Sequence, residues 1–190
     1  MVEPLQIGIA LTGSFCTLSQ VLDALQPLSG QYRLVPIMSP IVYESNTRFG
    51  TAAHFRERLQ GLCGHEIWHT IPQVEPIGPK KLLDALIVAP CTGNTLAKLA
   101  LGVTDTAVTM AVKSTLRNDK PILIALSTND ALQGGAKNIG ALQGLKNSYF
   151  VPYRQDDVEH KPRSCVADFS LIPAALEAAL KGKQLQPLLL

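Results

Sequence analysis

The stretch ALIVAPCTGNT, residues 85–95, begins as an apolar run and ends in a cluster of small polar residues. Residues 85–89 are short, rich in branched aliphatics and not alternating, which is typical of a strand buried on both faces of a parallel sheet. The polar cluster, residues 90–95, stands just ahead of a helical pattern. A turn between a buried strand and a helix is where α/β proteins bind ligands. The cluster is therefore the first candidate for a functional site.

Three more segments have the character of this strand: residues 7–11 (IGIAL), 33–38 (RLVPIM) and 121–126 (PILIAL). Helical patterns alternate with them at residues 15–28, 51–62, 94–101, 105–116 and 171–180. This alternation predicts a three-layer α/β fold, in which helices cover both faces of a doubly wound, flavodoxin- or Rossmann-like parallel sheet. Residues 63–81 carry three prolines and no persistent period, so we expect a loop there with at most one short strand.

The size and composition of the chain indicate one domain that associates with other chains. With 190 residues, a single domain spanning residues 1–190 is expected. Hydrophobic residues make up 46% of the chain and charged residues only 17%, which favours burial of some surface in a homo-oligomer. We expect the C-terminal helix and the apolar tail after it, about residues 171–190, to pack on the domain or on a partner.

Charge and cysteine usage argue against several classes of function. The net charge is +2 and the basic residues are scattered, so no nucleic-acid partner is expected. No apolar run approaches the roughly 20 residues of a membrane-spanning helix, which predicts no membrane association and a cytoplasmic location. The four cysteines form no C-x-x-C pair, which disfavours a zinc site or a redox dithiol, and we expect no metal.

Small polar turns follow three of the four predicted strands, at residues 12–16, 39–40 and 90–95. The first N–H groups of a helix lack internal partners, so a phosphate at a helix N-terminus finds donors and a favourable dipole. Gly13 would let the backbone approach such a phosphate, and Ser14 would add a hydroxyl. The three turns together predict an anion site at the carboxyl edge of the sheet.

An ordinary alternative is that Ser14, Thr92 and Asn94 only cap their helices. The spacing of Gly8 and Gly13 does not form G-x-G-x-x-G, and no G-K-[ST] occurs, which disfavours NAD in its usual mode and ATP. A mononucleotide such as FMN needs only one or two helix N-termini for its phosphate and an apolar, amide-lined slot for its ring. The sequence can supply both.

Residues 89–105, APCTGNTLAKLALGVTD, resemble the APxTxNTxAKxAxGxxD segment of the flavoprotein family that includes phosphopantothenoylcysteine decarboxylase and the lantibiotic-modifying decarboxylases. Residues 12–16 resemble the first phosphate loop of that family, Ser39 falls at its second phosphate-binding hydroxyl, and residues 127–130 (STND) stand where the decarboxylases have P-x-M-N. The resemblance implies an FMN site made of Gly13, Ser14, Cys16, Ser39, Pro90, Cys91, Thr92, Asn94, Thr95, Ser127 and Asn129.

Residues 74–100, 108–132 and 146–162 are more similar to one branch of that family, the B chains of bacterial dipicolinate synthases. This resemblance implies an oxidoreductase subunit that supports the NAD(P)-dependent oxidation of dihydrodipicolinate to dipicolinate in sporulation. It also implies a small dicarboxylate substrate and a separate A chain that carries the NAD(P).

The chain departs from the decarboxylase pattern at two places. The decarboxylases have a histidine ahead of the strand that leads into APxTxNT, whereas residues 70–159 contain none, and P-x-M-N has lost its methionine. Two alternatives to the synthase subunit stay open. One is an FMN-dependent decarboxylase of a cysteine conjugate, and the other is a non-catalytic scaffold subunit that binds flavin or another anion.

Asn94 and Asn129 are the candidate catalytic residues, since an amide can hydrogen-bond a flavin edge or a carboxylate; capping is the alternative role for Asn94. For Cys16 and Cys91, a small packing residue is the simpler interpretation than a nucleophile, because no neighbouring imidazole is evident. The cations of residues 159–164 (EHKPRS) could offset a dicarboxylate, although a solvated loop explains them more simply.

Overall fold

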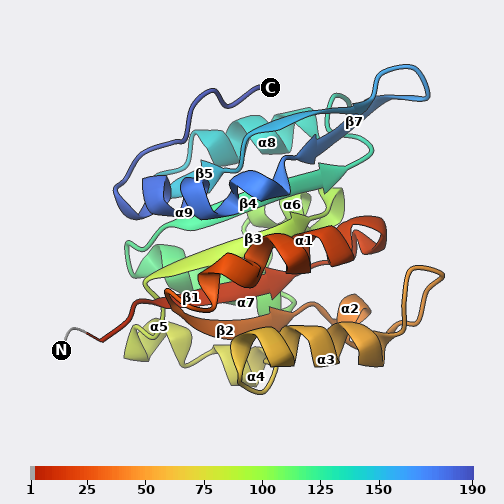
Figure 1. Cartoon of the computed structure of the whole chain (residues 1–190). Helices are drawn as coiled ribbons and strands as arrows, with labels where there is room; N and C mark the ends of the chain where they lie inside the picture. The colour runs from red at the N-terminus through yellow and green to blue at the C-terminus, as the bar shows by residue number, and fades with distance from the viewer. Residues whose placement is uncertain (1–2) are drawn as a thin grey trace.

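The structure is a computed structural model that describes residues 3–190. Its centre is a seven-stranded sheet in the order β2-β1-β3-β4-β7-β6, with β5 paired to the first half of β4 (Figure 1). The predicted α/β fold is confirmed, and the four predicted strands are β1 to β4. The strands are β1 (Gln6–Leu11), β2 (Arg33–Met38), β3 (Ala85–Cys91), β4 (Ile122–Thr128), β5 (Ser148–Phe150), β6 (Tyr153–Asp157) and β7 (Lys161–Ala167).

The central strands are buried on both faces because their side chains are mostly branched aliphatics. β1 pairs in parallel with β2 and β3, and β3 pairs in parallel with β4, so that Ile9 lies opposite Ile87 and Ile87 opposite Leu123. These three side chains are at most 1% exposed. Burial of an aliphatic side chain of this size stabilises the fold by about 1.5–3 kcal/mol. The middle of the sheet is therefore a rigid base for the turns at its edge.

The five predicted helical regions are also confirmed. α1 buries the stripe Leu18, Val21, Leu22 and Leu25, and 3-10 turns extend it at both ends to residues 15–28. Helices α1, α3 and α9 lie on one face of the sheet, and α7, with α4, α5 and α6 beside it, lies on the other (Figure 1). Within residues 3–190, no helix is both long and apolar enough to cross a membrane. The five helices are α1 (Leu18–Leu25), α3 (Ala52–Cys63), α6 (Gly93–Ala100), α7 (Ala107–Arg117) and α9 (Ile172–Leu180).

Residues 63–81 differ from the prediction of a loop. They contain two four-residue helices, α4 (Ile71–Val74) and α5 (Ile77–Lys80). One helical turn is too short to show a hydrophobic period, and Pro72 lies in the first turn of α4, where a proline is tolerated. The helices α2 (Pro40–Glu44) and α8 (Ala136–Gln143) were not predicted either.

The sheet is mostly, but not wholly, parallel. β6 and β7 form an antiparallel hairpin, and β7 also runs antiparallel to the end of β4. This hairpin was not predicted, because the polar sequence YRQDD of β6 lacks an apolar face and Pro162 in β7 is unusual within a strand. The hairpin places a polar wall beside the carboxyl end of β4.

The C-terminal tail lies along β5 and the start of β6. The Gln184 side-chain amide bonds both backbone groups of Phe150, at 2.8 Å and 2.7 Å. Farther along, Tyr153 donates its N–H to Leu188 and accepts one from Leu190. These contacts cover polar backbone groups at the exposed edges of β5 and β6.

Asp84 joins three strands at the edge opposite the polar turns. Its carboxylate accepts a hydrogen bond from the N–H of Gln6, the first residue of β1, at 3.0 Å, and one from the ammonium of Lys120, just ahead of β4, at 2.9 Å. Partial burial opposes ionisation, but the hydrogen bonds from Lys120 and Gln6 prevail and lower the pKa of the Asp84 carboxyl. The ionised form is therefore the one that the fold stabilises.

We expect Asp84→Asn to lower the free energy of unfolding by roughly 0.2–1 kcal/mol at pH 7, because the ion pair is lost while the Gln6 N–H still meets an oxygen. A carboxyl with a lowered folded-state pKa contributes fully above its ordinary value of 3.8, and the contribution is lost as the pH falls through the lower folded value. The difference from wild type should therefore shrink between pH 5 and pH 3 in urea denaturation.

Asp119→Asn is the matched control. The side chains of Asp119 and its partner Lys146 are 76% and 79% exposed, so this ion pair should contribute less to the free energy of unfolding. An Asp84→Asn variant no less stable than Asp119→Asn would contradict this role.

Candidate functional site

An open cavity of about 1510 Å³ lies at the carboxyl ends of β1, β3 and β4. The turn that follows each of these strands forms part of its wall, and the β6–β7 hairpin forms another part. Seven of the predicted cofactor-site residues line the cavity: Gly13, Ser14, Cys16, Thr92, Asn94, Ser127 and Asn129. The remaining four are buried and do not line it: Ser39, Pro90, Cys91 and Thr95. The structure thus brings together turns that are far apart in sequence, the turn after β1 lying 80 residues or more from the other two, because parallel strands end at one edge of the sheet.

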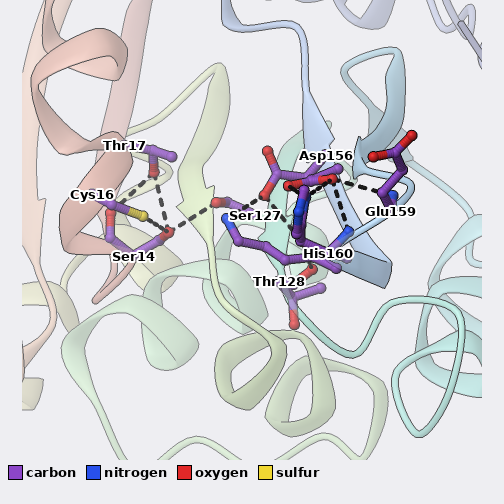
Figure 2. A network of polar contacts seen from close by, with 11 residues as sticks. Ser14, Cys16, Thr17, Ser127, Thr128, Asp156, Glu159 and His160 are labelled. Atoms are coloured by element: carbon purple, nitrogen blue, oxygen red, sulfur yellow. Dashed lines mark hydrogen bonds and ion pairs between the residues drawn. The ribbon is translucent and has the colours of Figure 1, made fainter.

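Ser14 lies in the turn after β1, and its hydroxyl points across the cavity edge to β4. Its Oγ lies 2.8 Å from the Ser127 Oγ, and the Thr17 hydroxyl donates to it at 3.2 Å (Figure 2). Ser14 makes no side-chain capping bond to the helical turn that it precedes. The capping alternative therefore does not apply to Ser14, whose hydroxyl instead links two strand ends.

Thr12 was not among the predicted site residues, yet it holds the turns after β1 and β3 together. Its hydroxyl donates to the Pro90 carbonyl at 2.6 Å and accepts the Thr92 N–H at 3.1 Å. The Thr12 side chain is 1% exposed, so these hydrogen bonds are shielded from water. A threonine that directly follows an apolar strand was the only sequence signal for this role.

The turn after β3 leads into α6 through a regular side-chain N-cap. Thr92 is the N-cap and accepts the Thr95 N–H at 3.2 Å, while the two hydroxyls lie 3.1 Å apart. Gly93 lies against the turn after β4: a Cβ there would stand 2.5 Å from the Thr128 Oγ1 and 2.7 Å from an Asp130 oxygen. A glycine is therefore required for these two turns to approach so closely.

Asn94 and Asn129 both line the cavity and are exposed. Within residues 3–190, neither side-chain amide makes a hydrogen bond. Because Thr92 is the N-cap of α6, Asn94 does not have that role. Both amides therefore stay available to a ligand, each as donor and acceptor.

Ser39 is the N-cap residue of α2, but its side chain makes no capping bond. Its N–H donates to the Leu11 carbonyl at 3.0 Å, which places it beside the end of β1. The Ser39 hydroxyl is buried, and among residues 3–190 it has no hydrogen-bond partner. A buried hydroxyl in this state costs about 1–3 kcal/mol, so it calls for an explanation.

The cysteines near the cavity differ in exposure. Cys91 is fully buried, and burial raises the pKa of its thiol to about 12. Cys165 lines the cavity, and burial raises the pKa of its thiol as well. Cys16 is exposed, with its sulfur 3.9 Å from the Ser14 hydroxyl. Cys91 therefore stays protonated and does not act as a nucleophile.

The β6–β7 hairpin contributes residues to the cavity that were not predicted, above all Arg154 and Asp156. Lys161 pairs with Asp156 at 3.1 Å, and the Ser164 hydroxyl donates to the Thr128 carbonyl at 3.2 Å. The Ser164 bond fixes β7 against the end of β4, and the Asp156–Lys161 pair links β6 to β7. Polar contacts from β7 to β4 and from β7 to β6 therefore hold this wall of the cavity in place.

Two further cations make ion pairs away from the cavity. His160 is exposed near the hairpin turn, where its ring contacts Asp157 at 3.1 Å, and Lys98 pairs with Asp105 at 2.7 Å. In the described part of the chain, no histidine lines the cavity and no group of three or more His, Cys, Asp or Glu side chains is arranged to hold a metal ion. The chemistry of the cavity therefore depends on hydroxyls, amides and a few charges.

Comparisons with known proteins agree with this geometry. A family model described as Flavoprotein matches residues 1–159. The chain is 42% identical over 185 residues to the B subunit of dipicolinate synthase from Bacillus subtilis (strain 168), covering 97% of this chain and 92% of that protein. The crystal structure of the dipicolinate synthase B subunit from Bacillus halodurans C superposes with a TM-score of 0.91 at 38% identity, over 99% of this chain and 97% of that one.

The FMN-dependent cysteine decarboxylase SpaF shares the fold, with a TM-score of 0.65 and 19% identity over 94% of this chain and 95% of its own. The matched family model spans the turns after β1, β3 and β4 that line the cavity. The resemblance inferred from residues 89–105 is thereby confirmed, and the chain belongs to the Flavoprotein family.

Proposed function

We propose that the chain binds FMN in the strand-end cavity and acts as the B subunit of a dipicolinate synthase. The observation that carries this proposal is the convergence of turns from β1, β3 and β4 on one cavity, where the side-chain amides of Asn94 and Asn129 have no hydrogen-bond partner among residues 3–190. The likeness to two dipicolinate synthase B subunits supports the assignment to that enzyme.

The phosphate of FMN fits the turns after β1 and β2. Gly13 and Ser14 lie at the start of a helical turn, whose free N–H groups favour an anion. Ser39 lies beside this turn, because its N–H bonds the Leu11 carbonyl at the end of β1. Its buried hydroxyl, which has no partner among residues 3–190, is the group that we propose donates to a phosphate oxygen. Such a bond would remove the cost of leaving this hydroxyl buried and unpaired.

The ring of FMN fits the wider part of the cavity. Phe15, Phe49 and Phe169 provide apolar lining, and the amides of Asn94 and Asn129 provide polar groups for the edge of the ring. Apolar walls with a few placed polar groups are typical of cofactor sites. The residues present therefore fit the cofactor.

When bound, FMN supplies a ring that can accept a hydride. Overall, the oxidation removes one hydride and one proton from a dihydrodipicolinate; the hydride reduces NAD(P)⁺ carried by the A chain to NAD(P)H, and the proton passes to water. The product ring is aromatic, which favours the reaction. The tasks of this chain are to orient the dianion through its amides and cations and to exclude water.

The decarboxylase alternative has less support in the cavity. No histidine lines it within the described residues, and the Cys91 thiol is too strongly buried to ionise. The structural likeness to SpaF, at 19% identity, is a likeness of fold. The oxidoreductase subunit is therefore the better-supported proposal.

Apolar surface remains for association with other chains. Leu101 is 76% exposed and Ile41 is 53% exposed. Ile41 lies near the cavity, because its Cγ2 is 3.0 Å from the place where Gly13, a lining residue, would carry a Cβ. We propose that a further copy of this chain, or the A chain, covers these residues.

Adding this chain to the A chain should raise the rate at which dihydrodipicolinate reduces NAD(P)⁺, followed by the absorbance of NAD(P)H. An A chain that reaches the full rate alone would refute the proposed role.

Ser39→Ala should weaken FMN binding by about 10–100-fold, the effect of losing one hydrogen bond to a charged group. Without FMN, its melting temperature should not fall, because the lost hydroxyl had no partner. Fluorescence titration with FMN and thermal unfolding measure the two effects.

Ser148→Ala is the matched control, since Ser148 in β5 is the other buried serine whose hydroxyl lacks a partner in residues 3–190. Its FMN affinity should equal that of the wild type. Equal FMN affinities for Ser39→Ala and Ser148→Ala would argue against a phosphate at Ser39.

A further inference from the structure

Three residues on neighbouring strands form a row along the cavity. Ser127 of β4 pairs with Val166 of β7, and Val166 pairs with Arg154 of β6. Residues directly opposite each other on antiparallel strands point to the same face of a sheet, and all three line the cavity. The row therefore runs from Ser127, whose hydroxyl contacts Ser14, to Arg154 on the hairpin wall.

The two ends of this row are far enough apart for two ligands. Neighbouring strands lie about 4.8 Å apart, so the Cα atoms of Ser127 and Arg154 are separated by about 10 Å. The cavity volume of about 1510 Å³ also exceeds the range of roughly 300–1,000 Å³ that is common for the pocket of one small ligand. A phosphate held by the turn at Ser14 leaves the hairpin end of the cavity open.

Arg154 is the charged group at that end that has no partner among residues 3–190. The charged residues that line the cavity are Asp23, Asp130, Asp156, Asp168, Arg154 and Lys161. Each carboxylate already has a partner inside the chain, in the pairs Asp23–Arg58, Asp130–Thr128, Asp156–Lys161 and Asp168–Ser170. In contrast, the Arg154 guanidinium has no hydrogen bond and no carboxylate oxygen within 4.0 Å among the described residues.

We propose that Arg154 binds one carboxylate of a small planar dicarboxylate and so determines the substrate class of the cavity, an inference that rests on the proposed function. A guanidinium presents parallel N–H donors that match the two oxygens of a carboxylate, which an ammonium cannot do. Apart from Arg154, four aspartates and one lysine line the cavity. A dianion would therefore be repelled unless Arg154 offset part of its charge. FMN keeps its phosphate at the opposite end, away from Arg154.

The test is calorimetric titration of the full-length protein, with and without saturating FMN. The probes are pyridine-2,6-dicarboxylate and pyridine-2-carboxylate. Arg154→Gln should weaken dicarboxylate binding by about 10–100-fold and reduce the preference for the dicarboxylate over the monocarboxylate. Arg154→Lys should fall between Arg154→Gln and the wild type. Both variants should keep wild-type affinity for FMN.

Arg163→Gln is the matched control, because it removes the same charge from the same hairpin at a residue that does not line the cavity. It should bind the dicarboxylate like the wild type. An equal loss in Arg163→Gln, an unchanged affinity in Arg154→Gln, or a wild type that does not bind the dicarboxylate would overturn the inference.

The FMN titrations separate this inference from the proposed function. Failure of the wild type to bind FMN would refute the cofactor proposal, while the dicarboxylate titration without FMN would still decide the role of Arg154. A loss of FMN affinity in Arg154→Gln with unchanged dicarboxylate affinity would instead place a phosphate at Arg154 and overturn the inference.

Discussion

The geometry of the cavity depends on the Thr12 hydroxyl, which lies between the Pro90 carbonyl and the Thr92 N–H at the ends of β1 and β3. These hydrogen bonds are buried, so water does not compete for them, and they fix one turn relative to the other. With both turns fixed, Ser14 can reach across to Ser127. The close approach at Gly93 then brings in the turn after β4. A small set of buried or tightly fitted contacts thus determines where the hydroxyls and amides of the cavity lie.

The cavity is built so that its two ends have different chemistry. At one end, the turn after β1 offers backbone N–H groups and the Ser14 hydroxyl, which suit a phosphate. At the other end, the hairpin offers a guanidinium, which suits a carboxylate. Val166 lies between these ends on β7, in the same row as Ser127 and Arg154. In the proposed complex, this separation would let a nucleotide and a dianionic substrate occupy one cavity without competing for the same cations.

Much of the fold could be predicted from the sequence because buried parallel strands are unbroken aliphatic runs, as in residues 85–89, and because helices such as α1 show a clear apolar stripe. The turns of the site could be predicted for the same reason, since each follows such a strand. The hairpin could not, because its polar residues look like a solvated loop until the pairing of Arg154 with Val166 is known. Thr12 was missed because a single threonine after a strand does not reveal which carbonyl it contacts. Local patterns thus specify elements, whereas partners across the sheet depend on tertiary structure.

The central claim is that hydroxyls and N–H groups from separate strand ends bind the phosphate of a flavin mononucleotide. The most direct test is to compare the dissociation constants of FMN and riboflavin, which share the ring and differ by the phosphate, by fluorescence titration of the purified protein. The account predicts that FMN binds at least about tenfold more tightly than riboflavin, with the difference arising from charge-assisted hydrogen bonds. Equal affinities, or no binding of either flavin, would contradict it.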